Sequence, residues 1–423
     1  MNRLITCFAA MTGAVLAFAT TPEISDVTAT QNESRRVTVG YTLKNASAII
    51  TLSVETNVTD DVWVSIGDEN LTHVAGEANK IVEPGTRSLT WLPHKAWPDH
   101  LIADGKIRIG VKAWALEEPP EIMAVDLKAA NTVNYYSSAA ALPGGVQDRR
   151  YKTDVLVLRH IPAANVTWTM GSPETELGRN ANNEYAHQVT LGADYWIGVY
   201  EVTQRQYENL KGEKKGHYNN PDYYATRPVD CCSYDQALGS DSFIVRLRQI
   251  SGISGFTFPT EAQWEFACRA GEGAALYNGQ NLSDKSKDAN LGLLARYDYT
   301  SGEGEIGNLA PQNSGPEMAS ALVGSYAPNA WGLYDMLGNC GEVTLDALDE
   351  ATRIDGVDPT GPDSLTTKCV VRGLKGGDDE DKNVYAQYLE IQAGYRTGLA
   401  YDGTGSWMTY RFSAMRWTVE LDD

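Results

Sequence analysis

The first third of the chain alternates between apolar and polar positions in short runs. The clearest run is Arg36–Leu43, in which every second residue is apolar. Similar runs cover residues 48–54, 62–66 and 107–113, with turn-rich residues such as Glu83-Pro84-Gly85-Thr86 between runs. A period of two is typical of strands with one buried face, and short strands at this spacing favour paired sheets. The pattern therefore predicts an all-β sandwich over residues 24–136.

No cysteine lies within residues 24–136, so the disulfide of an antibody-type domain is missing. The segment resembles the immunoglobulin-like or fibronectin-type accessory modules that precede catalytic or binding domains in exported bacterial proteins. Such modules usually act as spacers. The next stretch, residues 137–150, begins with the small residues SSAAALPGG, a composition that predicts a flexible linker.

Beyond residue 150 the pattern becomes irregular, and two helices are predicted. Thr260 and Gln263 form a capping box at the start of the first helix, and Gly271 lies where a C-terminal cap is expected. The second helix is predicted over Tyr234–Ile250, where the periodicity is less regular. Both helices are interpreted as parts of the scaffold.

The chain begins with a pattern typical of a secretory signal peptide. A short basic start precedes the apolar run Leu4–Phe18, which closes on Ala17-Phe18-Ala19. The alternative is a membrane anchor, but the run is shorter than the roughly 20 residues that span a bilayer. We expect residues 1–19 to be removed. The mature chain should then be secreted, periplasmic or at the cell surface, without a transmembrane segment.

The composition narrows the classes of partner. A formal net charge of -20 argues against nucleic acid, because phosphate binding needs a basic surface. An acidic surface instead keeps an exported protein soluble and favours cations or basic partners.

The cysteines suggest neither a zinc ribbon nor a thioredoxin-type site, because no C-x-x-C pair occurs. Six cysteines are present, and Cys7 would leave with the signal peptide. The remaining five are an odd number, so at least one thiol is free or paired between chains. The neighbours Cys231 and Cys232 could close a strained ring, although bridges to distant partners are the more ordinary arrangement.

Several longer motifs occur in one order along the second part of the chain. They are Thr169–Ser172, Glu184–Val189, Tyr200–Tyr207, Arg227–Val229, Phe258–Ala267, Pro328–Asn339, Arg372-Gly373 and Gly376-Gly377. In this order they resemble the formylglycine-generating enzyme family, which includes sulfatase-modifying factors and related ergothioneine-synthesis and pyoverdine-maturation proteins. The resemblance implies an α+β fold class for residues 151–423, an irregular domain related to the C-type lectin fold.

The family's catalytic residues are not matched. Its aerobic members hold copper with two cysteine thiolates that follow the Gly-Gly of the C-terminal motif. Here Gly376-Gly377 is followed by the acidic run Asp378–Asp381, and no cysteine occurs after Cys369. Gly341 also replaces a tryptophan that lines the family's active site. We therefore expect no copper and assign no catalytic residue.

The resemblance instead retains residues that hold structural calcium in the family. The matching donors are the side chains of Asp335 and Glu342 and the carbonyl groups of Gly338 and Cys340. Oxygen donors of this kind suit a hard cation. The alternative is that Asp335 caps a turn and Glu342 is solvated.

A second family calcium site is matched only in part. Asn290 and the adjoining Leu291 correspond to its ligands, but the sequence does not place an acidic partner.

A late segment has the composition of a recognition surface, and we expect it to bind a protein or glycan ligand. Its candidate residues are Tyr395, Arg396, Tyr401, Trp407, Tyr410 and Arg411. The alternative is that these aromatic residues complete the core of a helix-poor domain.

Two functions follow from these observations. The first is a secreted, non-catalytic member of the family that acts as a binding module with structural calcium. The second is a formylglycine-generating or other oxidative enzyme with rearranged ligands, such as Cys340 with Cys369, or the acidic run Asp378–Asp381. Cys340 also has an alternative role as a reactive thiol.

We predict that the exported protein begins at Thr20, because Ala17-Phe18-Ala19 has the small residues that signal peptidase requires. Mass spectrometry of the intact exported chain should find the mass that lacks residues 1–19. A chain that retains Met1 after export would contradict the prediction.

Overall fold

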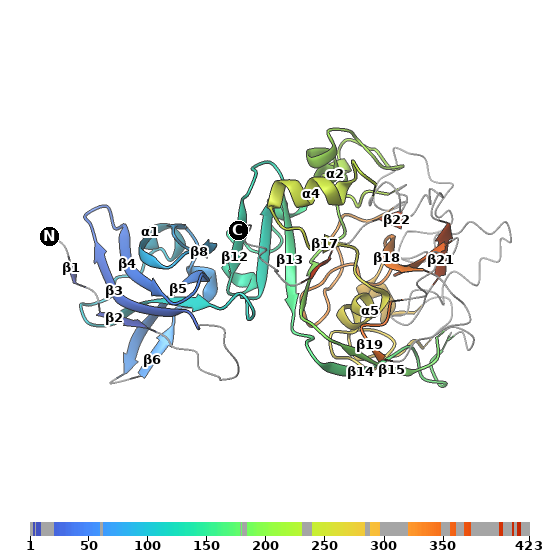
Figure 1. Ribbon diagram of the computed structural model, residues 1–423, viewed down its shortest axis with the longest axis horizontal. Coiled ribbons are helices and arrows are strands. Elements are labelled where there is room, and N and C mark those ends of the chain that lie inside the picture. Colours follow the sequence, from blue (N-terminus) through green and yellow to red (C-terminus); the bar gives the residue numbers. More distant parts are fainter. Residues whose placement is uncertain are drawn as a thin grey trace. The chain divides into compact units, whose positions relative to one another are not determined.

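The computed structural model describes most of the chain, in two units. Side chains are described for residues 21–59, 62–177, 179, 184–230, 239–283, 288–296, 320–346, 356–360 and 370–373, and only backbone for 3–4, 6–9, 347, 368–369, 397–400, 408–409 and 413–415. Unit 1 comprises Met1–Ala124 and Val133–Asp148, and unit 2 comprises Val125–Thr132 and Arg149–Asp423. Figure 1 shows the elements of both units.

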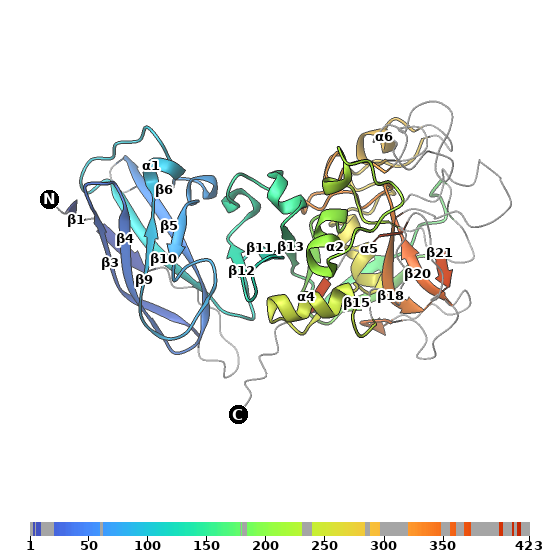
Figure 2. The same cartoon turned by 90° about the horizontal axis from the view of Figure 1, so that it is seen from above.

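Unit 1 contains two sheets. The first has the order β1 (Arg3–Leu4), β3 (Glu23–Gln31), β4 (Val37–Lys44), β9 (Gly85–Trp91), β7 (Val74–Gly76). The second has the order β2 (Thr6–Ala9), β10 (Ile107–Trp114), β5 (Ala48–Thr59), β6 (Val62–Ser65), and β8 (Ile81–Val82) pairs with β5. The unit also contains η1 (Asp68–Asn70), α1 (Pro93–Ala96), β12 (Val133–Tyr136) and η2 (Ala139–Ala141). The strands of unit 1 are seen from two directions in Figures 1 and 2.

The two sheets share one hydrophobic core, which explains the alternation in the sequence. In β4, Val37, Val39, Tyr41 and Leu43 are buried, and the residues between them are more exposed. The phenol of Tyr41 donates a hydrogen bond of 2.6 Å to the carbonyl oxygen of Glu77, so its polar end is satisfied inside the core. The predicted β-module is therefore present, with strands close to the expected runs.

Residues 137–150, where the composition predicts a flexible linker, carry defined structure. η2 lies within this stretch, and η3 (Arg149–Lys152) begins at its end. Leu142 is completely buried, and the hydroxyl of Ser138 donates a hydrogen bond of 2.6 Å to Asp68. A buried leucine and a side-chain hydrogen bond both reduce conformational freedom, which the content of small residues did not reveal.

Strands also dominate unit 2. One sheet includes, in order, β11 (Ile122–Asp126, which belongs to unit 2 from Val125 on), β13 (Val155–Ile161), β16 (Tyr195–Gly198), β23 (Ser413–Met415) and β17 (Phe256–Thr257). A second contains β14 (Val166–Met170), β15 (His187–Leu191), β19 (Gly356–Val357). A third contains β21 (Thr397–Ala400), β20 (Lys368–Arg372), β18 (Gly341–Ala347), β22 (Met408–Thr409).

The helices of unit 2 are short. They are α2 (Gln204–Lys211), η4 (Tyr224–Thr226), α4 (Phe243–Ser251), α5 (Glu261–Arg269) and α6 (Leu291–Leu294). The architecture is mostly β with several sheets, which agrees with an irregular, helix-poor domain. In the described part of the chain, no helix has the length and apolar character needed to cross a membrane.

The first predicted helix is confirmed as α5. Thr260 accepts a hydrogen bond of 3.2 Å from the backbone N–H of Gln263, and the Gln263 side chain accepts one of 3.0 Å from the Thr260 N–H. The predicted C-terminal cap differs by one residue. Ala270 takes the left-handed cap conformation, with φ 49°, and Gly271 follows with φ 93°.

The second predicted helix is confirmed only where α4 (Phe243–Ser251) lies. Residues 239–242 are not helical, and α4 begins at Phe243, where the hydroxyl of Ser242 caps the N–H of Val245 at 3.2 Å. A serine N-cap of this kind defines a helix start more sharply than a weak apolar pattern does. Residues 231–238, which include both neighbouring cysteines, lie outside the described residues.

Candidate functional site

Helix α5 is buried along its whole length, although it carries three charged residues. Glu261, Glu265 and Arg269 are each at most 6 % exposed. Removing a charge from water costs several kcal/mol unless an opposite charge and hydrogen bonds compensate for it. The burial of α5 therefore requires ionic partners around the helix.

Arg372 at the end of β20 supplies the main partner. Its guanidinium is fully buried and donates hydrogen bonds of 3.0 Å to Glu261 Oε1 and 2.5 Å to Glu265 Oε2. Arg269 Nε donates to the other oxygen of Glu265 at 2.8 Å. One carboxylate thus joins two guanidinium groups, and α5 is linked to β20.

The same carboxylate also holds the loop after β14. Glu265 Oε1 accepts a hydrogen bond of 2.8 Å from the backbone N–H of Gly171, and Arg269 Nη2 donates one of 2.7 Å to the Gly171 carbonyl oxygen. Gly171 has φ 88°, and a Cβ at this position would lie 2.4 Å from the carbonyl oxygen of Tyr185. Only glycine fits this backbone, so the loop lies against the charged cluster.

The charges around Glu265 keep it ionised. Burial alone would raise the pKa of Glu265, but Arg269, Arg372 and the N–H of Gly171 together lower it to about 2. Burial alone would lower the pKa of Arg372, whereas Glu265 and Glu261 raise it. Both partners of the pair therefore stay charged at neutral pH.

The loop that leads into β18 ends next to α5. Trp264 donates a hydrogen bond of 2.7 Å from its indole N–H to Glu342 Oε2, and Glu342 is opposite Arg372 in the ladder of β18 with β20. The guanidinium of Arg372 lies 5.2 Å from the centroid of the Trp264 ring. Glu342 is therefore a buried carboxylate next to the ionic cluster, and the alternative of a solvated Glu342 is wrong.

Glu201 holds the middle of this loop. Its two oxygens accept hydrogen bonds of 2.5 Å from Asn339 Nδ2 and 3.1 Å from the backbone N–H of Cys340. Gly338 has φ 73°, and a Cβ there would lie 2.2 Å from the carbonyl oxygen of Arg296. The loop thus packs against neighbouring backbone with no space for a side chain at Gly338.

Asp335 lies at the start of the loop and is almost fully buried. Its Oδ2 accepts a hydrogen bond of 2.6 Å from the N–H of Gly324, and its own φ is 56°. Burial lowers the pKa of Lys152, and the nearby negative charge of Asp335 partly offsets this effect. The turn-stabilising role considered for Asp335 is thus present, whatever else the carboxylate binds.

The predicted calcium donors lie between Asp335 and Glu342, and one of their oxygens lies close to Gly373. A Cβ placed on Gly373 would lie 3.5 Å from the carbonyl oxygen of Cys340 and 3.9 Å from that of Met336. The N–H of Gly338 donates to the Gly373 carbonyl oxygen at 3.3 Å. Buried carboxylates and carbonyl groups form the type of donor set that Ca²⁺ takes. Within the described ranges, however, no three His, Cys, Asp or Glu side chains lie close enough to hold a metal by themselves.

The second predicted calcium position is organised by Asp288. Its Oδ1 accepts hydrogen bonds of 2.8 Å from the N–H of Asn290 and 2.9 Å from the N–H of Leu291. Its Oδ2 accepts from the N–H and hydroxyl of Ser283, at 2.6 and 2.8 Å. Asp288 therefore positions Asn290 and Leu291. The sequence pattern alone did not point to this acidic residue.

The predicted ligand-binding residues Tyr395, Arg396, Tyr401, Trp407, Tyr410 and Arg411 lie outside the described residues. Two described strands lie among them in sequence. β21 pairs with β20, and β22 pairs with Gly341 and Glu342 of β18. The backbone on either side of residues 401–407 thus belongs to the sheet that carries the predicted calcium loop.

The described cysteine side chains are those of core residues. Cys268 and Cys340 are both buried and free of disulfides. Burial raises the pKa of Cys268 to about 12, and its Sγ lies 3.7 Å from the carbonyl oxygen of Met336. A thiol with such a pKa is a poor metal ligand or nucleophile, because both roles need the thiolate.

Cys340 and Cys369 lie too far apart to share a metal ion. Cys340 lies beside Gly373, and Cys369 is at an earlier position on the extended strand β20. At the usual rise per residue, the four steps between Cys369 and Gly373 span roughly 13 Å. Two thiolates on one ion lie within about 5 Å of each other.

Comparison with known proteins identifies the source of these motifs. Residues 157–398 match the FGE-sulfatase family, described as a sulfatase-modifying factor enzyme 1-like domain. The chaperone protein LppX of Paenibacillus barcinonensis is 25% identical over 195 residues, which cover 39% of this chain and 66% of LppX. The formylglycine-generating enzyme of Mus musculus is 26% identical over 170 residues, which cover 38% of this chain and 37% of the enzyme. In both cases the chain spans less than two thirds of the relative's length.

Two solved structures are also similar. PvdO from Pseudomonas aeruginosa has a TM-score of 0.46 and 23% identity, and the match covers 61% of this chain and 94% of PvdO. Treponema denticola variable protein 1 has a TM-score of 0.45 and 21% identity, with 62% of this chain and 96% of that protein covered.

We predict that Glu265→Gln destabilises the protein by about 3–5 kcal/mol at neutral pH, because Arg372 and Arg269 lose their shared counter-charge. Urea unfolding monitored by circular dichroism measures this change. The matched control is Glu77→Gln, which removes a carboxylate from the exposed Glu77–Lys80 pair and should cost less than about 1 kcal/mol.

Glu265→Gln should also change how the free energy of unfolding depends on pH under acidic conditions. The pKa of Glu265 falls from 4.5 to about 2 on folding, so its contribution is complete above 4.5 and is lost as the pH falls toward 2. The free energy of unfolding of Glu265→Gln should therefore fall less steeply in this window than that of the unmodified protein. Equal stability and equal pH dependence of the two proteins would contradict the assigned role.

Proposed function

Because the chain belongs to the FGE-sulfatase family, we propose that it keeps the scaffold of that family without its copper chemistry. In this proposal the chain is exported, and unit 2 binds a protein or glycan ligand. Calcium would have a structural role in the loop that precedes β18.

The observation that carries the proposal is the distribution of thiols. No cysteine follows Cys369 in the sequence, where the resemblance places both copper ligands. Cys268 is buried with a pKa of about 12, so it stays a neutral thiol at physiological pH. Copper(I) requires soft thiolate or thioether donors. The residues of this chain therefore do not fit the copper site of the aerobic enzymes.

A binding role is supported by the rigidity of the scaffold around α5. The ionic cluster of Glu265, Arg269 and Arg372 joins the helix to β20 and to the loop at Gly171. Binding surfaces benefit from such preorganisation, because less conformational entropy is lost on association. One relative is named a chaperone protein, and two others are named formylglycine-generating enzymes. Their sequence identities to this chain are similar, at 25%, 26% and 27%.

Calcium would be held by the carboxylates of Asp335 and Glu342 with the carbonyl groups of Gly338 and Cys340. When bound, it would connect the two ends of the loop and supply no redox chemistry. Support comes from the burial of both carboxylates and from the carbonyl oxygen of Cys340 near Gly373. At the second position, Asn290 and Leu291 would contribute beside Asp288.

The alternative is an oxidative enzyme with rearranged ligands. The spacing of Cys340 and Cys369 argues against the pair as ligands of one ion, since the two positions are separated by about four residue steps along β20. The acidic run Asp378–Asp381 offers hard oxygen donors, which suit neither copper(I) nor oxygen activation at a thiolate centre. The binding role is therefore the proposal that the observations favour.

We predict that the purified protein, mixed with copper(I) and a cysteine-containing sulfatase peptide, consumes no oxygen above the buffer blank and leaves the peptide thiol intact. An oxygen electrode and mass spectrometry of the peptide measure these outcomes. Mouse formylglycine-generating enzyme under the same conditions is the positive control. Stoichiometric copper held by thiolates, together with peptide oxidation that Cys340→Ser abolishes, would establish the enzymatic alternative.

We also predict that a calcium chelator lowers the melting temperature by roughly 5 °C, since a ligand that binds only the folded state stabilises it by mass action. Glu342→Gln should reduce this difference, because one of the two donor carboxylates loses its charge.

The matched control for calcium is Asp346→Asn. Asp346 is also a buried carboxylate of β18, but it accepts a hydrogen bond of 2.6 Å from the N–H of Glu261 and is no predicted donor. This variant should be less stable, with the full calcium-dependent shift retained. A melting temperature of the unmodified protein that is the same in calcium and in chelator would refute the calcium site.

A further inference from the structure

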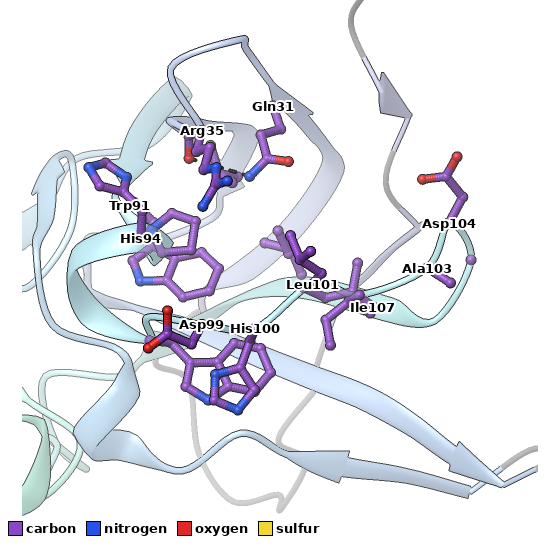
Figure 3. Close-up of a pocket in the computed structure, with 16 residues that line it drawn as sticks. Gln31, Arg35, Trp91, His94, Asp99, His100, Leu101, Ala103, Asp104 and Ile107 are labelled. Atoms are coloured by element: carbon purple, nitrogen blue, oxygen red, sulfur yellow. Dashed lines mark hydrogen bonds between the residues drawn. The ribbon is translucent and has the colours of Figure 1, made fainter.

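A cavity of about 540 Å³ lies at one end of the sandwich in unit 1. This volume is within the range of about 300–1,000 Å³ that is typical of small-molecule sites. Its walls come from the turn between β3 and β4 and from the segment between α1 and β10. Figure 3 shows the side chains that line it. None of the sequence motifs of unit 2 contributes to this cavity.

The floor of the cavity is part of the sandwich core. Trp91, Val37 and Ile109 line it, and each is at most 2 % exposed. These residues belong to β9, β4 and β10, so both sheets support the floor. Close packing of a core holds such side chains in one arrangement. The cavity therefore has a rigid apolar base that includes an indole ring.

A second aromatic surface lies in the segment after α1. The rings of Trp97 and His100 are stacked, with 4.0 Å between centroids and 15° between planes. His100 Nδ1 lies 2.7 Å from the carbonyl oxygen of Pro98, which can only accept, so Nδ1 carries the hydrogen. The backbone N–H of Trp97 donates a hydrogen bond of 2.7 Å to the carbonyl oxygen of Pro93. This aromatic pair is thus oriented by backbone contacts without a ligand.

Polar side chains line the rim on two sides. In Figure 3, Gln31 and Arg35 lie on one side of the cavity, and Asp99 lies with His100 on the opposite side. Arg35 and Asp99 both have left-handed backbone conformations, with φ 60° and 63°. Gln31 Nε2 donates to the carbonyl oxygen of Arg35 at 3.3 Å, which ties the amide to the turn. Donors and an acceptor are therefore available around the aromatic surfaces.

The charges of the lining restrict the ligand class. Arg35 is basic, whereas Asp99 and Asp104 are acidic. The carboxylates disfavour phosphate, sulfate and carboxylate ligands, and the guanidinium disfavours a cation, because like charges repel in a partly desolvated site. A neutral ligand with an apolar face and several hydroxyl groups matches both the rings and the rim. A pyranose ring has one face of C–H groups and a perimeter of hydroxyl groups.

We propose that this cavity is a binding site for a neutral saccharide. One sugar ring packs on the aromatic surface of Trp97 and His100, and its hydroxyl groups reach Arg35, Gln31 and Asp99. The β-module is then a glycan-recognition unit in its own right, in addition to any spacer role. This site is independent of the function proposed for unit 2.

The test is isothermal titration of the full chain with cellotriose, xylotriose, mannotriose and chitotriose, with a sulfated trisaccharide as the charged comparison. At least one neutral trisaccharide should bind with 1:1 stoichiometry. Trp97→Ala should weaken this binding about tenfold, because an aromatic anchor dominates a small site. Asp99→Asn should also weaken binding, because the carboxylate is lost. The fold should be kept, because asparagine tolerates the left-handed backbone at this position.

The matched control is Trp63→Ala, which removes an indole ring from β6 outside the cavity and should leave saccharide affinity unchanged. Melting curves of the three variants show whether each one is folded, and Asp99→Asn keeps the test valid if Trp97→Ala is unstable. The proposal is overturned if no neutral trisaccharide binds, if the sulfated one binds more tightly, or if affinity survives both cavity substitutions.

Discussion

The buried pair of Arg372 and Glu265 constrains the architecture of unit 2. Neither charge can be removed from water without the other, because the free energy of burying an isolated ion is far larger than the stabilisation from a hydrophobic contact. The pair requires α5 to lie against β20, and the second oxygen of Glu265 requires Gly171 and Arg269 to approach the same point. A helix that is buried on every face can therefore carry three charged residues. The ionic cluster thus ties α5 to β20 and to the loop at Gly171.

This constraint separates family membership from family chemistry. The motifs Thr169–Ser172, Phe258–Ala267 and Arg372-Gly373 place the residues of the ionic cluster, and this cluster requires no metal and no thiolate. A chain can thus retain the motifs while it lacks the copper ligands, because the motifs are explained by the packing of α5. The family match over residues 157–398 consequently supports the scaffold, whereas the absence of copper chemistry is part of the proposed function.

Local features could be predicted from the sequence, and long-range contacts could not. The alternation in β4 and the capping box at Thr260 depend on neighbours within a few residues, and both are present. The contact of Arg372 with Glu261 joins positions 111 residues apart, so the sequence showed both residues in motifs without revealing their pairing. The burial of Leu142 was missed for the same reason, since small neighbouring residues suggested a linker.

The cavity of unit 1 could not be predicted from sequence patterns either. Trp91, Trp97 and Arg35 come from three separate segments, and only the closure of the sandwich brings them to one cavity. Periodicity identified β4, which follows Arg35, but it did not identify β9, which ends at Trp91. It also contains no information about how a turn and a helix end meet at the edge of a sheet.

The burial that stabilises unit 2 also limits its chemistry. Cys268 lies among Glu265, Arg269, Arg372 and Glu342, and burial is the largest influence on its pKa. The two arginines favour the thiolate, but they are already compensated by carboxylates, so the thiol remains neutral. An oxidising copper centre needs the opposite arrangement, with thiolates that a metal and oxygen can reach. In the proposed binding role, the paired charges of Glu265, Arg269 and Arg372 would instead hold the surface of unit 2 in one shape.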